Sequence, residues 1–155
     1  MRVLVVGGGV AGVAMARELV RKEVGDVTIL TRESVATSPA FTDAPQWYLA
    51  NTANSTMSLK VGEPDDYTIW LKETFFCSEA DFAPRACFGN YLEQVWLDTV
   101  ALAKKTGVKL EVIYGEMTSV RELDGLTCEV RLGDGNSFES DAVILLYWVR
   151  GTSFG

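Results

Sequence analysis

The chain has 155 residues, of which 48% are apolar, and it carries a formal net charge of −7. These values predict a single globular domain with a substantial core, and the negative charge argues against nucleic acid or an anionic membrane surface as a partner. The sequence contains no histidine. A Ser-His-Asp hydrolase and a histidine-ligated metal site are therefore excluded, and we expect no metal.

The first stretch of the chain, residues 2–31, has the pattern of one βαβ unit. Apolar runs over 2–6 and 27–30 predict two strands, and a helical pattern between them predicts a helix over 10–24. A strand, a glycine-rich turn, a helix and a second strand form the context in which a glycine motif binds a dinucleotide.

The turn of this unit holds three glycines spaced as G-x-G-x-x-G: Gly7, Gly9 and Gly12. Gly7 permits a tight turn, Gly9 lets a pyrophosphate approach the backbone, and Gly12 lets the helix lie close to the strand. The N–H groups at the helix start, aided by the helix dipole, then face the diphosphate. We predict dinucleotide binding here, against the alternative that the glycines serve packing alone.

The end of the second predicted strand is the next diagnostic position, because an acidic residue there normally binds the adenosine ribose. The sequence instead reads Thr31-Arg32-Glu33. Three interpretations compete. In the first, Glu33 reaches back to the ribose; in the second, Thr31 binds it weakly. In the third, Thr31 and Arg32 accept a 2′-phosphate, which would favour NADP. A fourth interpretation makes Arg32 and Glu33 solvated loop charges.

Residues 34–87 predict an irregular insertion, because proline, serine, threonine and asparagine are frequent there. Within it we expect a short helix near 46–50 and another over 64–71. A long helix follows over 88–105, with two lysines and then a glycine at its end.

The last part of the chain, residues 108–147, predicts strands. We expect 108–114 to lie beside the first strand, on the side opposite the second. Three short strands between 117 and 140 form an antiparallel meander, with turns at Asp-Gly and Gly-Asp-Gly. The apolar run over 141–147 is typical of a central strand that is buried on both faces.

Several motifs in this order match one known group. They are VLVVGGGVAG at 3–12, Asn51-Thr52-Ala53 before Met57-Ser58, Asp66-Tyr67-Thr68-Ile69-Trp70-Leu71, Phe82-Ala83-Pro84-Arg85 before Phe88-Gly89-Asn90-Tyr91-Leu92, and Leu132-Gly133-Asp134-Gly135. Through them, nearly the whole chain resembles the FAD/NAD(P)-binding domain of flavoprotein oxidoreductases. Within these, it is similar to FAD-NAD(P)-binding proteins related to flavin-containing and N-hydroxylating monooxygenases.

The resemblance implies a fold and a site. The fold is α/β, a Rossmann-like FAD/NAD(P)-binding domain over 1–155, with a central parallel sheet and a small antiparallel β-meander. The cofactor is FAD, with NAD(P) as a further candidate. The resemblance assigns the pyrophosphate to Gly7, Gly9, Val10 and Gly12, the ribose to position 31 or 33, the phosphates or the flavin to Arg85, and the adenine to the main chain of Met117.

The chain departs from the family pattern at three points. Thr31 replaces the usual glutamate, Leu146-Tyr147-Trp148 stands where Ala-Thr-Gly usually closes the domain, and the family usually continues for a second region. A tryptophan in place of a glycine would block or reshape the cofactor pocket.

Three functions remain open from the sequence. The first is a flavin-dependent oxidoreductase, or its FAD-binding part, acting on a small molecule that the sequence does not identify. The second is a non-catalytic or repurposed subunit, acting as a homodimer or with a second chain that supplies the missing half. The third is an NADP-binding reductase.

The three cysteines, Cys77, Cys87 and Cys128, lack C-x-x-C spacing and indicate reduced thiols and a cytoplasmic location. No run of apolar residues is long enough for a membrane span.

Overall fold

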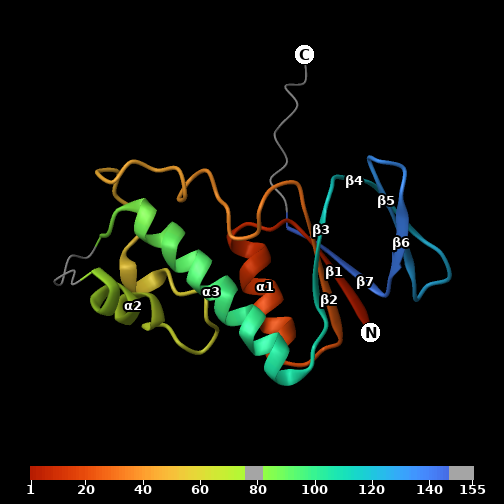
Figure 1. Ribbon diagram of the computed structural model, residues 1–155, viewed down its shortest axis with the longest axis horizontal. Coiled ribbons are helices and arrows are strands. Elements are labelled where there is room, and N and C mark those ends of the chain that lie inside the picture. The colour runs from red at the N-terminus through yellow and green to blue at the C-terminus, as the bar shows by residue number, and fades with distance from the viewer. Residues whose placement is uncertain (76–81, 147–155) are drawn as a thin grey trace, which may run out of the picture.

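The computed structural model describes residues 1–75 and 82–146. At its centre lies a four-stranded parallel sheet of order β3–β2–β1–β7 (Figure 1). Its strands are β1 (Arg2–Val6), β2 (Asp26–Thr31), β3 (Leu110–Tyr114) and β7 (Ala142–Leu145). The predicted strand–helix–strand start of the chain is confirmed, with the helix ending three residues earlier than expected.

Helices α1 (Val10–Arg21) and α3 (Arg85–Thr106) lie on one face of this sheet, as Figure 1 shows. Their small and branched residues meet the β-branched residues of the strands. This cluster contains Val5, Ala16, Val20, Val27, Ile29 and Ala103. Helical spacing on one side and alternation along β1 and β2 on the other therefore bring both apolar faces together.

The opposite face of the parallel sheet is covered by an antiparallel sheet of order β4–β5–β6 (Figure 1). Its strands are β4 (Met117–Glu122), β5 (Cys128–Leu132) and β6 (Ser137–Ser140). The cluster between the two sheets contains Leu4, Val6, Leu30, Val130 and Leu132. The α/β class, the parallel sheet and the antiparallel meander are thus confirmed.

The predicted position of β3 is wrong. This strand pairs with β2, from Val27↔Leu110 to Thr31↔Tyr114, whereas β7 occupies the place beside β1. The reason lies in the helices: α3 packs against α1 on the same face of the sheet. A right-handed crossover that keeps its helix on the face of α1 continues away from β1 instead of returning past it.

The prediction that the last strand is central and buried on both faces is also wrong. Strand β7 is the outermost strand of the sheet on its side, and its residues are half-buried or exposed. Leu146 continues its pairing, since its N–H donates to the carbonyl of Val6 at 2.8 Å. Of the predicted Leu146-Tyr147-Trp148 obstruction, Tyr147 and Trp148 lie outside the described residues, as does Cys77.

The insertion contains α2 (Asp66–Phe75) and a 3-10 turn (Asn54–Thr56). The helix predicted near 46–50 does not form. That segment instead runs beside the chain before α3: the N–H of Ala50 donates to the carbonyl of Ala83, and the N–H of Arg85 donates to the carbonyl of Tyr48. These inter-segment hydrogen bonds replace the ones that a helix would have made.

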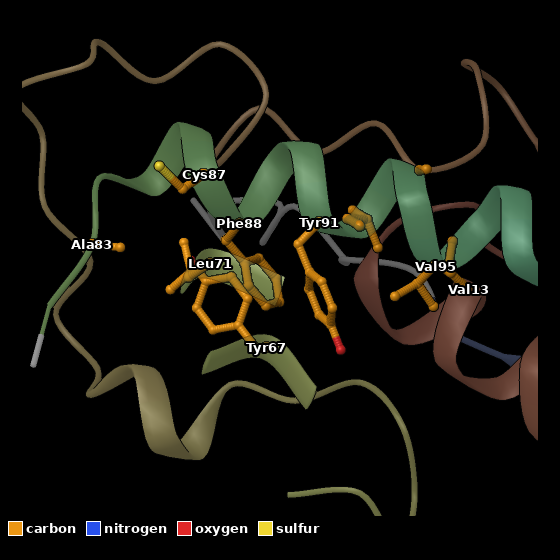
Figure 2. Close-up of a cluster of buried hydrophobic side chains, with 10 residues drawn as sticks. Val13, Tyr67, Leu71, Ala83, Cys87, Phe88, Tyr91 and Val95 are labelled. Atoms are coloured by element: carbon orange, nitrogen blue, oxygen red, sulfur yellow. The ribbon is translucent and has the colours of Figure 1, made fainter. Parts of the chain in front are cut away.

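Helices α2 and α3 are joined by an aromatic cluster, shown in Figure 2. Tyr67, Phe88 and Tyr91 are almost fully buried, with ring centroids 4.9–5.8 Å apart. The Tyr91 hydroxyl donates to Asp66 Oδ2 at 2.6 Å and accepts from the N–H of Leu59 at 3.2 Å. The family-like Asp66–Leu71 and Phe88–Leu92 motifs therefore hold the insertion on α3, which is a structural role.

Candidate dinucleotide-binding site

The glycine turn leaves β1 at its carboxyl end and enters α1 directly. Gly7 has a φ of +116°, which side chains rarely tolerate, and its N–H donates to the carbonyl of Leu30 at 2.8 Å. A Cβ on Gly12 would overlap the carbonyl oxygen of Gly7. Gly7 is therefore required by the backbone conformation of the turn and Gly12 by the packing of α1 on it, as the motif predicts.

Gly9 is different. It is the N-cap of α1 with φ −80° and ψ −159°, an ordinary extended conformation, and among the described residues a Cβ there would contact only the carbonyl oxygen of Thr37, at 3.7 Å. No side chain of the described residues caps the helix start. The first turn of α1 therefore presents its N–H groups beside Gly9. This residue has no side chain, although no contact with the described residues requires a glycine there.

Thr31 ends β2 against this turn. The residue is 8% exposed, and a Cβ on Gly8 would lie 2.8 Å from Thr31 Oγ1. The following segment then crosses the turn, because the N–H of Ala36 donates to the carbonyl of Gly8 at 2.8 Å. Ala36 is buried with φ +65°, a conformation that costs a non-glycine residue on the order of 1 kcal/mol and is often found near functional sites.

Arg32 and Glu33 extend beyond the end of β2 and are exposed. Arg32 Nη1 lies 3.6 Å from Glu116 Oε1, whereas Glu33 has no ion pair with a described residue. Glu116 lies between β3 and β4, immediately before Met117, whose side chain is partly buried between the two sheets. Glu116 is not among the residues predicted from the sequence, although its place just after a predicted strand is a usable signal.

Arg85 lies elsewhere. It is the first residue of α3; its Nε donates to the carbonyl of Leu49 at 3.3 Å, and its guanidinium lies 4.4 Å from the centre of the Tyr48 ring. No hydrogen bond or ion pair joins it to the glycine turn among the described residues. The structure thus brings the predicted residues of positions 7–12 and 31 together, while Arg85 contacts the insertion.

Two further polar side chains, one buried and one partly buried, hold the insertion in place. Asn54 is 5% exposed, and its Oδ1 accepts a hydrogen bond from the N–H of Ala83 at 3.0 Å. Lys60 Nζ lies 2.9 Å from Asp66 and 3.6 Å from Asp98.

Within residues 1–75 and 82–146, no group of acidic or cysteine side chains could hold a metal ion, and no helix could span a membrane.

The sequence profile of the FAD-NAD(P)-binding family matches residues 4–147, which is almost the whole chain. The chain belongs to this family. The matched range begins in β1, contains the glycine turn and both sheets, and ends just after β7. The fold and the glycine turn are thus those of the FAD-NAD(P)-binding family that the profile identifies. No curated protein sequence matches the chain.

Solved structures of larger proteins share this FAD-NAD(P)-binding fold. Oxidised steroid monooxygenase bound to NADP matches with a TM-score of 0.65 and 19% identity over 94% of this chain and 26% of its own. The closed structure of cyclohexanone monooxygenase gives 0.64 and 17%, over 93% and 25%. OTEMO in complex with FAD and NADP gives 0.61 and 14%, over 98% and 28%. This chain thus spans about a quarter of the length of each.

Proposed function

We propose that this chain binds FAD across the glycine turn and serves as the FAD-binding part of a flavin-dependent oxidoreductase of the monooxygenase type. Family membership supports the ligand class. The names of the structural neighbours, which include two monooxygenases and a complex with both FAD and NADP, support the reaction class. The shared length, about a quarter of each neighbour, confines the proposal to the cofactor-binding part.

The observation that carries the proposal is the backbone at Gly9. Neither the φ of this residue nor its packing against the described part of the chain requires a glycine, because a Cβ would make an ordinary 3.7 Å contact there. A bare backbone beside an uncapped helix start fits a pyrophosphate, which needs both close approach and N–H donors. The residues present therefore fit the group.

The proposed site extends along the carboxyl ends of β1 and β2. The backbone of the turn and the first turn of α1 would hold the pyrophosphate, through Gly7, Gly9, Val10 and Gly12. Thr31, Arg32 and Glu33 lie at the ribose end, and the main chain of Met117 is the proposed contact of the adenine. When bound, the flavin supplies hydride or oxygen chemistry, and the protein contributes binding and orientation.

Arg85 is retained in the proposal on the family resemblance alone. Its contacts with Tyr48 and Leu49 place its guanidinium on the insertion. A guanidinium is always charged and binds phosphate oxygens in pairs, so this side chain remains suited to the phosphates or the flavin.

The test is the visible absorption spectrum of the purified protein, recorded as isolated and again after addition of FAD and desalting. The proposal predicts flavin bands that persist after desalting and disappear on denaturation and filtration. A protein that stays colourless under both conditions contradicts it. Binding of NADPH by such a colourless protein would favour the reductase alternative.

A further inference from the structure

The ends of β2 and β3 place a basic and an acidic side chain next to each other at the ribose end of the proposed site. The N–H of Gly115 donates to the carbonyl of Thr31 at 2.9 Å, which holds the chain after β3 beside the end of β2. The neighbouring side chains then meet, with Arg32 Nη1 3.6 Å from Glu116 Oε1. Both remain about two-thirds exposed and can therefore reach a ligand.

A dinucleotide fold distinguishes its ligands at this place. An acidic residue at the end of the second strand accepts hydrogen bonds from the ribose hydroxyls, whereas an arginine accommodates a 2′-phosphate. Thr31 has no carboxylate, and its side chain is packed against Gly8. The adjacent turn instead supplies a carboxylate from Glu116, together with the arginine that it pairs with.

We propose that Glu116 replaces the acidic residue that β2 lacks and, with Arg32, selects a dinucleotide whose adenosine ribose carries free hydroxyls over one that carries a 2′-phosphate. This inference rests on the proposed function and deepens it. Of the alternatives that the sequence left open, it favours a carboxylate at the ribose over a 2′-phosphate site of Thr31 and Arg32, and it takes that carboxylate from Glu116 instead of Glu33.

The selection follows from charge. The Glu116 carboxylate accepts hydrogen bonds from the hydroxyls of an unmodified ribose, and the same negative charge repels a 2′-phosphate. It also offsets the positive charge of Arg32, which would otherwise attract that phosphate. An exposed ion pair contributes little to folding stability, so removing it leaves the fold intact and changes ligand preference alone.

The inference is tested by calorimetric binding of two probes, ADP-ribose and 2′-phospho-ADP-ribose, which differ only at the ribose 2′ position. The unmodified protein is expected to prefer ADP-ribose. In Glu116→Gln the ratio of the two dissociation constants shifts toward the phosphorylated probe by about tenfold or more, because one charge-assisted hydrogen bond is lost and one repulsion is removed. Adding Arg32→Ala to this variant should abolish the gain for the phosphorylated probe.

The matched control is Glu111→Gln, which removes the same charge from a glutamate near the start of β3 that pairs with Lys109 at 2.9 Å. Its ratio of dissociation constants should equal that of the unmodified protein. An unchanged ratio in Glu116→Gln overturns the inference, and so does a shift that appears in Glu33→Gln instead. In either case retention of FAD by the unmodified protein leaves the proposed function standing. A protein that binds neither probe nor FAD overturns both.

Discussion

The side chain of Thr31 packs onto the backbone of Gly8, so closely that a Cβ at position 8 would lie 2.8 Å from Thr31 Oγ1 and 3.0 Å from Thr31 Cβ. The end of β2 and the glycine turn after β1 therefore form one packed unit. In a dinucleotide fold these two segments contact the ribose and the pyrophosphate. The dinucleotide motif leaves position 8 unspecified, but in this chain the contact with Thr31 favours a glycine at that position.

Replacing Gly8 by alanine should destabilise the protein by about 1–3 kcal/mol, because the added methyl group overpacks against Thr31. Urea unfolding measures the change. In Gly8→Ala/Thr31→Ala the cost of the alanine at position 8 should be smaller, since Thr31 Oγ1 and Cγ2, which lie 2.8 and 3.3 Å from the added Cβ, are gone. Strict additivity of the two single changes would contradict this contact.

Gly12→Ala should be more damaging, because its Cβ would overlap the backbone carbonyl of Gly7, which cannot move without displacing the turn. We expect a loss of about 3 kcal/mol or a failure to fold. Gly133→Ala is the control, since a Cβ there meets its nearest atoms at 3.8 Å and the position has no positive φ. The measurement is thermal unfolding of both variants. Equal melting temperatures would contradict the close approach of α1 to β1.

Sequence reasoning predicted those parts of the fold that depend on local pattern. The strand β1, the helix α1 and the three strands of the meander follow from apolar spacing and turn residues. The order of the sheet did not, because a right-handed crossover permits β3 on either side of the first two strands. Packing of α3 on α1 decides between the sides, and this is a contact between segments far apart in sequence.

The site shows the same division. The roles of Gly7 and Gly12 follow from motif spacing, and the structure agrees with both. The pairing of Arg32 with Glu116 could not be predicted, because it depends on β3 lying beside β2. Arg85 was selected from a motif, and its contacts with Tyr48 depend on the extended path of the insertion, which sequence reasoning had assigned to a helix.

Tyr91→Phe should lower the free energy of unfolding by about 1–3 kcal/mol, because it removes the 2.6 Å hydrogen bond to Asp66 and the acceptor of the Leu59 N–H. Urea unfolding is the measurement. Tyr114→Phe is the control, since Tyr114 is 65% exposed and its hydroxyl has no hydrogen bond to a described residue. Equal stability of the two variants would show that Tyr91 does not hold the insertion.

The same tyrosine predicts a loss of stability at alkaline pH. Burial, and then the hydrogen bond to Asp66, raise the pKa of Tyr91 to about 12 in the folded protein. The folded state therefore holds the phenolic proton more tightly than the unfolded state, whose tyrosine pKa is about 10. This contribution is complete below pH ~10 and is lost as the pH rises toward 12.

Because lysines also titrate in this range, the informative quantity is the difference in unfolding free energy between the unmodified protein and Tyr91→Phe. This difference should shrink as the pH is raised above about 10. A difference that stays constant up to pH ~12 would contradict the raised pKa of Tyr91.

The most direct test of FAD binding across the glycine turn compares Gly9→Ala with the unmodified protein in an FAD titration that follows flavin fluorescence. Within residues 1–75 and 82–146 the added methyl group meets only the carbonyl oxygen of Thr37, at 3.7 Å, and the φ of −80° suits alanine, so the melting temperature should hardly change. The FAD dissociation constant should rise by about tenfold or more, because the methyl group occupies the approach of the pyrophosphate. Unchanged FAD affinity in a folded Gly9→Ala protein would contradict the account.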